Sequence, residues 1–463
     1  MRSNSAGSVH ADQSWRSLRF RARFLGGLAG LMHRTCIATL RSQGPVARPM
    51  GAAISDIFAR TIIDSRGNPT IEVDCYVDGK LKGRAAVPSG ASTGTYEAVE
   101  LRDGGTKWMG KGVQVAVDNV NGPIREALIG IDPAEQERID CTLIELDDSE
   151  NKGSLGANAI LGVSLACLRA ASDGELWKHV SQGGETSLPV PMMNILNGGA
   201  HAESNVDVQE FMVVPHGFES FSEALRAGVE IYHSLKSTLK QEGLLGGVGD
   251  EGGFAPNLSR NEEGLRLVRE AIEVAGYSPG KEVSIALDVA AQEFFDGSNY
   301  LIDGESISGS NLGRIYSDWL DEYPIVSIED PFGEDDWDAW KEFTAREGHR
   351  VQIVGDDLYV TNPKRLEKGI SIQASNAILI KLNQIGTFTE TMEVIRKSRE
   401  AGFGTIISHR SGETSDDIIS DLAVGTNSMQ IKTGAPARSD RTSKYNQLIR
   451  ISEKVGNYSR LFQ

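Results

Sequence analysis

Two patterns of hydrophobic and polar residues divide the chain. From Ile54 to Val87, apolar residues alternate with other residues in three short runs. The runs are separated by the turn-forming sequence at 65–69 and by the pair Asp78-Gly79. Alternation with a period of two is typical of strands with one buried face, and Asp-Gly favours a tight hairpin. We therefore predict an antiparallel meander at the start of the folded part.

A helical pattern follows the meander. Apolar residues then recur three or four positions apart, as on one face of a helix, at Val113, Val117, Val120 and Ile124. Residues 157–171 are strongly apolar, and we expect them to form a helix that packs against the predicted strands. These elements together predict a small α+β domain over residues 50–188.

The second half of the chain repeats a shorter unit. Six apolar runs, each ending in a polar or charged residue, occur at 283–288, 325–330, 352–357, 377–381, 405–409 and 429–432. Their ionisable end residues are 23 to 41 positions apart, and one strand–helix unit takes about 30 residues. This spacing indicates parallel strands that alternate with helices. We therefore predict an α/β fold: a TIM-like β/α barrel over residues 189–463, capped by the smaller N-terminal α+β domain.

Charge is spread unevenly along the 463 residues, whose formal net charge is -17. An acidic chain of this kind argues against general nucleic-acid binding, which needs a basic face. Residues 1–49 are the exception, with eight Arg, no Lys and one acidic residue. This basic, Ser-rich leader has the composition of an organellar transit peptide; the alternative is an upstream extension before a start at Met50. Its apolar patch at 24–32 is too short to span a membrane.

Three carboxylates follow successive predicted strands: Asp288, Glu329 and Asp356. The C-terminal ends of barrel strands form the active-site face, so these side chains should converge there. Hard oxygen ligands of this kind suit Mg²⁺, whose remaining positions go to water and substrate. The alternative for each carboxylate is that it caps the next helix or pairs with a cation.

Basic residues follow the remaining strands. Lys381 would lie beside the carboxylates, where desolvation and nearby cations lower a lysine pKa and make a neutral amine available as a base; alternatively, it is a structural partner for Asp356. Arg410 and Ser411 could bind a phosphate through a bidentate guanidinium and a hydroxyl. Lys432 adds a second cation. A surface ion pair is the alternative for Arg410 and Lys432.

Polar loops supply further candidates. Glu251 lies between glycines in Gly-Asp-Glu-Gly-Gly and is a candidate general acid, with Glu210 able to share its proton. His201 lies in a second glycine-rich loop. The segment 88–94 contains small residues only and could close over a substrate as a lid. These groups fit a reaction in which a base removes a proton α to a carboxylate, metal stabilises the resulting aci-carboxylate, and an acid helps a β-hydroxyl to leave.

Long motifs that include these residues give the chain a close resemblance to the bacterial-type enolase family (phosphopyruvate hydratases). They cover essentially all of residues 54–463 and include SGASTG (89–94), NGGAHA (197–202), GDEGGFAP (249–256), SIEDPF (327–332), GDDLYVTNP (355–363), KLNQIG (381–386), SHRSGET (408–414) and IKTGAPARSDR (431–441). The resemblance implies reversible dehydration of 2-phospho-D-glycerate to phosphoenolpyruvate in glycolysis and gluconeogenesis.

The resemblance also implies a role for each matching residue. Lys381 would accept the proton and Glu251 would donate one, with Glu210 assisting. His201 and His409 would line the site. Asp288, Glu329 and Asp356 would hold one Mg²⁺, and Ser89 would help to hold a second Mg²⁺ that binds with substrate, making two ions per active site. The substrate would be contacted by Gln209, Arg410, Ser411 and Lys432.

Family members are usually cytoplasmic homodimers or octamers of dimers, and the resemblance implies the same here, with an organelle as the alternative if 1–49 are a transit peptide. Two other functions stay open. The first is that of a different superfamily member, such as a racemase or cycloisomerase, which would not need residues that bind a phosphate. Members of the family also bind partners at cell surfaces, and such a secondary role is compatible with this sequence, although it lacks the C-terminal lysine that plasminogen binds.

Overall fold

The structure is a computed structural model that describes residues 52–90, 94–199 and 204–462. The predicted leader at 1–49, His201 and the middle of the predicted lid lie outside the described residues. Across the described ranges, no helix combines the length and the apolar character that crossing a membrane requires.

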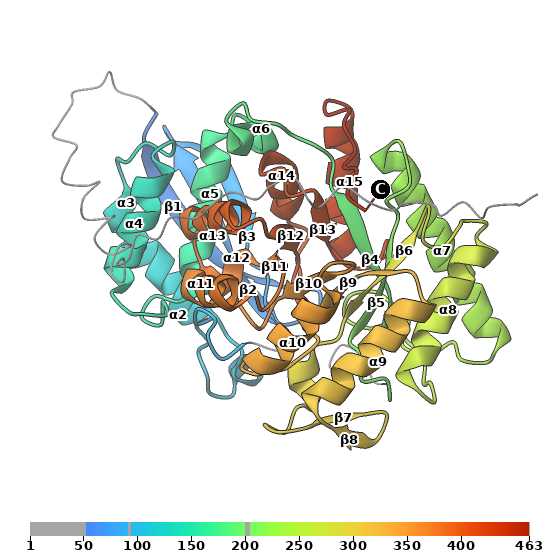
Figure 1. Ribbon diagram of the computed structural model, residues 1–463. Helices are drawn as coiled ribbons and strands as arrows, with labels where there is room; N and C mark the ends of the chain where they lie inside the picture. The colour runs from blue at the N-terminus through green and yellow to red at the C-terminus, as the bar shows by residue number, and fades with distance from the viewer. Residues whose placement is uncertain (1–51, 91–93, 200–203, 463) are drawn as a thin grey trace, which may run out of the picture. The chain divides into compact units, whose positions relative to one another are not determined.

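Three antiparallel strands form the first sheet, as the alternating pattern predicted (Figure 1, blue). They are β1 (Ile54–Ile63), β2 (Pro69–Val77) and β3 (Lys80–Ala86). The predicted hairpin joins β2 to β3, and both of its central residues have positive φ angles, 50° at Asp78 and 74° at Gly79. Such a turn matches the right-handed twist of the strands that it connects.

Seven helical segments follow this sheet: η1 (Lys107–Gly110), α2 (Gln114–Asn119), η2 (Val120–Ile124), α3 (Arg125–Leu128), α4 (Gln136–Asp147), α5 (Ala157–Ala171) and α6 (Leu176–Ser181). Of these, α2, η2, α3 and α5 pack on the sheet, α4 packs on α5, and α6 packs on α14 (Ile418–Gly425). The predicted apolar helix is α5, which packs on β2 and β3. Gly83 of β3 makes this close approach possible, because a Cβ atom there would lie 2.0 Å from the carbonyl oxygen of Ala166.

Eight strands form a closed barrel, which confirms the predicted barrel fold. In chain order they are β4 (Val190–Asn197), β5 (Glu210–Val214), β6 (Ser284–Asp288), β9 (Ile325–Glu329), β10 (Gln352–Gly355), β11 (Ala377–Ile380), β12 (Gly404–Ser408) and β13 (Gln430–Lys432). The last six coincide with the six predicted runs to within two residues at either end. Their side chains are nearly all buried, as expected of strands with the barrel core on one side and helices on the other.

Helices and a small hairpin connect these strands. The helices are α7 (Phe221–Gln241), α8 (Asn261–Val274), η4 (Ala291–Phe294), α9 (Gly309–Glu322), α10 (Trp337–Glu347), α11 (Pro363–Ile372), α12 (Leu382–Ile385), α13 (Phe388–Glu400), α14 (Ile418–Gly425) and α15 (Ser439–Ser452). The hairpin consists of β7 (Tyr300–Ile302) and β8 (Glu305–Ile307). Long helices such as α7 to α9 pack outside the barrel (Figure 1).

The strand β5, which is not among the six predicted runs, departs from the parallel arrangement. This strand runs antiparallel to both of its neighbours, β4 and β6. The stretch 198–209 between β4 and β5 is close to the shortest connection that a parallel crossover can use, and the chain instead turns back beside β4. The reversal brings the start of β5 to the face where the other strands end, and Glu210 is paired with Asp288.

Candidate active site

The predicted residues meet at one end of the barrel. Asp288, Glu329 and Lys432 are the last residues of their strands, and Asp356 and Lys381 directly follow theirs. One depression is lined by Gln209, Glu210, Glu251, Asp288, Ala290, Asp330, Asp356, Asp357, Lys381, Ser408, His409, Arg410, Ser411 and Lys432. Most of the predicted site residues therefore line this one depression, although they are spread over the sequence from 209 to 432.

Lys432 is the centre of the first charge cluster. Its ammonium group lies 2.7 Å from Asp288 Oδ2, 2.8 Å from Glu329 Oε1 and 3.2 Å from Glu210 Oε1. Burial lowers the pKa of Lys432, but Asp288, Glu210 and Glu329 outweigh it and raise the pKa well above its ordinary value. The alternative of a surface ion pair is wrong for Lys432, because its side chain is only 2% exposed.

Asp356 and Lys381 form a second, directly contacting ion pair. Gln384 donates to the other oxygen of Asp356, at 2.9 Å. Burial lowers the pKa of Lys381, yet Asp356 and Glu329 raise it above its ordinary value. The sequence-based expectation of a lowered pKa for Lys381 is thus wrong, because it counted desolvation and the neighbouring cations but not the carboxylate in contact.

The depression carries an excess of negative charge that suits a divalent cation. Its lining includes six carboxylates (Glu210, Glu251, Asp288, Asp330, Asp356, Asp357) and three basic groups (Lys381, Arg410, Lys432). Burial, and then Asp288, raise the pKa of Glu329 well above its ordinary value. Its Oε2 is buried and accepts no hydrogen bond from any described residue. Ionised carboxylates without enough cations are costly in a buried site, and a bound divalent ion relieves that cost.

The three predicted metal ligands are not yet gathered around one point. Asp288 and Glu329 both face Lys432, whereas Asp356 faces Lys381. Among the described residues, two other groups bring their ligand atoms within 4.8 Å of one another: Asp330 with Asp356 and Asp357, and Glu210 with Glu251 and His409. Asp330 already accepts the backbone N–H groups of Asp356 and Asp357, at 2.9 and 2.7 Å. It therefore shapes the loop after β10.

Glu251 and Glu210 lie together, with carboxylate oxygens within 4.8 Å of each other. Asn194 of β4 donates to Glu251 Oε2 at 3.0 Å, and His409 Nε2 lies 3.3 Å from Glu251 Oε1. Burial, and then the charge of Glu251, raise the pKa of Glu210 well above its ordinary value. Two buried carboxyl groups at this distance favour one shared proton.

Arg410 is held in a buried ion pair. Its two terminal nitrogens bind Glu97 at 3.0 and 3.2 Å, and one of them also donates to Asn383 at 3.0 Å. The Arg410 side chain is 4% exposed and that of Glu97 is 6% exposed, so the alternative of a surface ion pair is wrong here as well. Ser411 is the next residue after Arg410 in the same loop. The other predicted substrate contact, Gln209, donates a hydrogen bond to Asp288 at 3.1 Å.

Ser89 lies apart from the carboxylates. Its backbone pairs with Gly412 at 2.8 Å in both directions. Its hydroxyl donates to Glu100 at 3.0 Å and accepts from Arg102 at 2.9 Å. None of its hydrogen-bond partners in the described part of the chain is a predicted metal ligand, so the structure does not bring Ser89 to the other three.

Several residues at this site were not found from the sequence. Asn194, Gln384 and Glu97 contact predicted residues directly, and Arg441 contacts His409. Asn194 had a usable signal, because it is the single polar residue inside the apolar run 190–196. Gln384 and Glu97 lie in polar segments where nothing in the local pattern distinguishes them.

Comparisons with known proteins agree with this arrangement. Residues 54–179 match the family model described as "Enolase, N-terminal domain", and residues 185–462 match "Enolase, C-terminal TIM barrel domain". A protein named enolase from Acidothermus cellulolyticus (strain ATCC 43068 / DSM 8971 / 11B) is 55% identical over 412 residues, which are 88% of this chain and 96% of that protein.

Proposed function

The chain belongs to the enolase family and is a lyase, and we propose that it interconverts 2-phospho-D-glycerate and phosphoenolpyruvate with Lys381 as the base and Glu251 as the acid. The family supports the interconversion itself. The assignment of roles rests on one observation: Lys381 and Glu251 line the same depression, together with Lys432 and five further carboxylates.

Each residue can then be given a task. Lys381 removes the proton next to the substrate carboxylate, for which its amine must be uncharged. Glu251 delivers a proton to the departing hydroxyl group, and Glu210, whose pKa is raised by burial and by Glu251, helps to keep that proton in place. Arg410 and Ser411 bind the phosphate, Gln209 and Lys432 contact the rest of the substrate, and His409 and His201 line its cavity.

The negative lining supports a bound metal. Asp288, Glu329 and Asp356 would hold one Mg²⁺, and Ser89 would contribute to a second after exchanging its present hydrogen bonds. When bound, Mg²⁺ supplies positive charge that stabilises the aci-carboxylate form of the substrate. Lys381 and Lys432 form ion pairs with these three carboxylates, so a bound metal ion would compete with the two lysines for them.

Substrate choice tests the function against another superfamily activity. The protein is expected to turn over 2-phosphoglycerate and to leave glycerate, which lacks the phosphate, essentially unreacted. The reason is that Arg410 is a buried cation whose guanidinium geometry fits a phosphate. Both substrates would be followed by NMR with Mg²⁺ present. Racemisation or cyclisation of an unphosphorylated carboxylate, with no reaction of 2-phosphoglycerate, would support the alternative instead.

Replacing Glu329 by glutamine should separate metal binding from folding. In the parent protein, Mg²⁺ at about 100 times its Kd should raise the free energy of unfolding by about 2.7 kcal/mol. Glu329→Gln should need at least about tenfold more Mg²⁺ for the same gain, because one of three carboxylate ligands is lost. Thermal unfolding across a Mg²⁺ series, with the exposed Glu322→Gln as control, measures this shift. An unchanged Mg²⁺ response would remove Glu329 from the metal site.

The same variant has a predicted pH signature without metal. The pKa of Glu329 is raised in the folded protein, so its ionised form costs stability, and the metal-free parent should lose stability as pH rises through that pKa. Glu329→Gln should weaken this loss.

The remaining assignments follow from the family. We place the protein in the cytoplasm as a homodimer or an octamer of dimers, and we divide the chain at about residue 188 into a capping domain and a catalytic barrel. A secondary surface-binding role has no supporting observation in the described residues.

A further inference from the structure

Arg441 joins two loops of the candidate site. It lies in the first turn of α15, and its side chain is fully buried. Its guanidinium donates to the carbonyl oxygens of Arg410 at 2.6 Å, Ser411 at 2.6 Å and Asp250 at 3.1 Å. The first two belong to the loop after β12 and the third to the loop that carries Glu251.

The same guanidinium contacts His409. One Arg441 terminal nitrogen lies 2.5 Å from His409 Nδ1. Arginine has only N–H donors and no acceptor, so His409 Nδ1 must be the acceptor and cannot carry a proton. The four terminal N–H groups of Arg441 are then all used, by His409 and the three carbonyl oxygens.

This contact fixes the state of the imidazole ring. A ring without a proton on Nδ1 is neutral and carries its proton on Nε2. The surroundings agree with a neutral ring: burial, together with the charges of Arg441 and Lys432, lowers the pKa of His409 to about 3 against the opposing effect of Glu251. The protonated Nε2 is the atom that lies 3.3 Å from Glu251 Oε1.

We propose that Arg441 is a positioning residue that holds His409 as the neutral Nε2-protonated tautomer, so that this Nε2–H, which lies near Glu251 without yet forming a hydrogen bond to it, donates to Glu251 and stabilises its carboxylate form. This role deepens the proposed function, since Glu251 becomes a carboxylate when it has delivered its proton to the departing hydroxyl. The atom balance is simple: His409 keeps its own proton throughout and the proton lost by Glu251 leaves with the hydroxyl as water.

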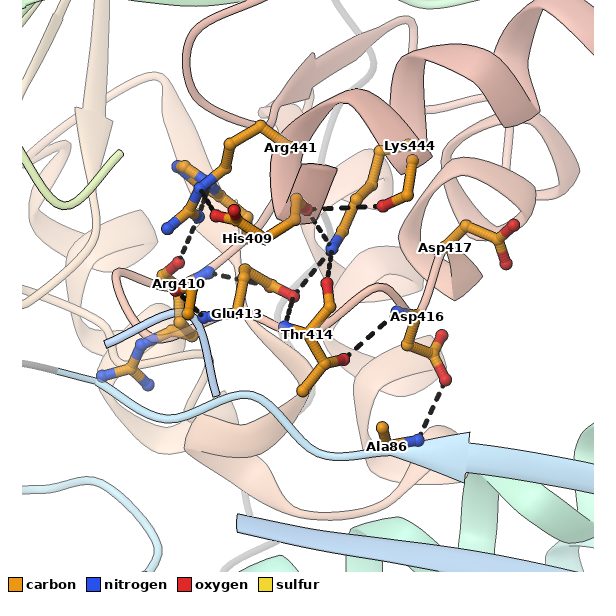
Figure 2. A network of polar contacts seen from close by, with 12 residues as sticks. Ala86, His409, Arg410, Glu413, Thr414, Asp416, Asp417, Arg441 and Lys444 are labelled. Atoms are coloured by element: carbon orange, nitrogen blue, oxygen red, sulfur yellow. Dashed lines mark hydrogen bonds and ion pairs between the residues drawn. The ribbon is translucent and has the colours of Figure 1, made fainter. Parts of the chain in front are cut away.

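The helix offers a matched control in Lys444, one turn after Arg441. Lys444 is also buried and also holds the loop after β12, through Glu413 at 2.9 Å and the carbonyl oxygen of Thr414 at 2.7 Å. Figure 2 shows both side chains directed at the segment from His409 to Thr414. The hydrogen bonds of the Lys444 ammonium group go to Glu413, Thr414 and Asp440 and not to His409, so its removal disturbs the same loop without freeing the ring.

The test is the tautomer itself, read by ¹⁵N NMR on the full chain labelled at histidine and without substrate. The chain has eight histidines, and His409→Gln assigns the relevant signals. The parent protein should show an unprotonated Nδ1, a protonated Nε2 and no titration near the ordinary histidine pKa of about 6.5. A proton on Nδ1, or a charged ring at neutral pH, would overturn the proposal. This measurement needs no turnover, so it fails or succeeds independently of the proposed function.

Two variants extend the test. In Arg441→Met, the His409 ring should no longer be restricted to one tautomer, so proton signals should appear from both ring nitrogens. The same variant should slow phosphoenolpyruvate formation about tenfold more than exchange of the substrate C2 proton. Lys444→Met should leave the tautomer as in the parent and slow both steps to the same extent. An unchanged tautomer in Arg441→Met, or its equal release in Lys444→Met, would contradict the role assigned to Arg441.

Discussion

Replacing Lys381 by alanine is expected to abolish exchange of the C2 proton of 2-phosphoglycerate with solvent and to reduce turnover by about 10²- to 10⁴-fold, the range that a general base contributes. The other basic groups lining the depression, Arg410 and Lys432, are each held by carboxylates, Glu97 in one case and Asp288, Glu210 and Glu329 in the other. Neither can take over as base, because arginine stays protonated and the three carboxylates around Lys432 raise its pKa well above its ordinary value. Proton exchange is followed by NMR in deuterated water.

The same substitution should also change stability. Lys381 lowers the pKa of the buried Asp356 against the effect of burial, so its removal leaves an unpaired buried carboxylate, at a cost of about 3–5 kcal/mol. Mg²⁺ should restore part of that loss, because it offers Asp356 a new cation. Lys364→Ala is the matched control, since that side chain is 83% exposed. Proton exchange that survives in folded Lys381→Ala would show that another group is the base.

Replacing Glu251 by glutamine should divide the reaction into its two steps. Glutamine keeps the size of the side chain and its contacts with Asn194 and His409, but it has no acidic proton to give. Loss of the hydroxyl should therefore slow by about 10²-fold or more, whereas C2 proton exchange should slow much less, because Lys381 is intact. Rapid-quench measurement of phosphoenolpyruvate, set beside deuterium uptake at C2, gives the two rates.

The division of labour depends on the difference between these rates. Glu150→Gln serves as the control, since the Glu150 side chain is 91% exposed and lies outside the candidate site. Equal slowing of exchange and hydroxyl loss in Glu251→Gln would mean that Glu251 acts on both steps, for example by orienting the substrate. That result would leave the enzyme class intact and remove the assignment of Glu251 as the acid.

Much of the barrel could be predicted from its sequence because each strand is short, apolar and followed by a polar side chain. Six strands were found in this way, and the apolar helix 157–171 was found with its bounds. The strand β4 and the antiparallel β5 were missed for a physical reason: β4 contains the polar Asn194, and the direction of β5 is set by the short connection 198–209, which the hydrophobic pattern does not encode.

The candidate residues were accessible from the sequence, but their pairing was not. Position at a strand end indicates that Lys381 and Lys432 reach the mouth of the barrel, yet the partner that each finds there depends on three-dimensional contacts. The raised pKa of Lys381 is the clearest case, because one carboxylate in contact outweighs burial and two nearby cations. The role of Arg441 could not be predicted, because this residue lies on a helix after the last strand, where the sequence does not distinguish a buried arginine from an exposed one.

The most direct test is an NMR time course of 2-phosphoglycerate with the full chain in deuterated water. With Mg²⁺ present, phosphoenolpyruvate should accumulate and the remaining 2-phosphoglycerate should acquire deuterium at C2, and a chelator should stop both changes. The chain would then carry out proton removal and hydroxyl loss at one metal-dependent site. Neither phosphoenolpyruvate nor deuterated substrate, with Mg²⁺ present and the protein folded, would contradict the account.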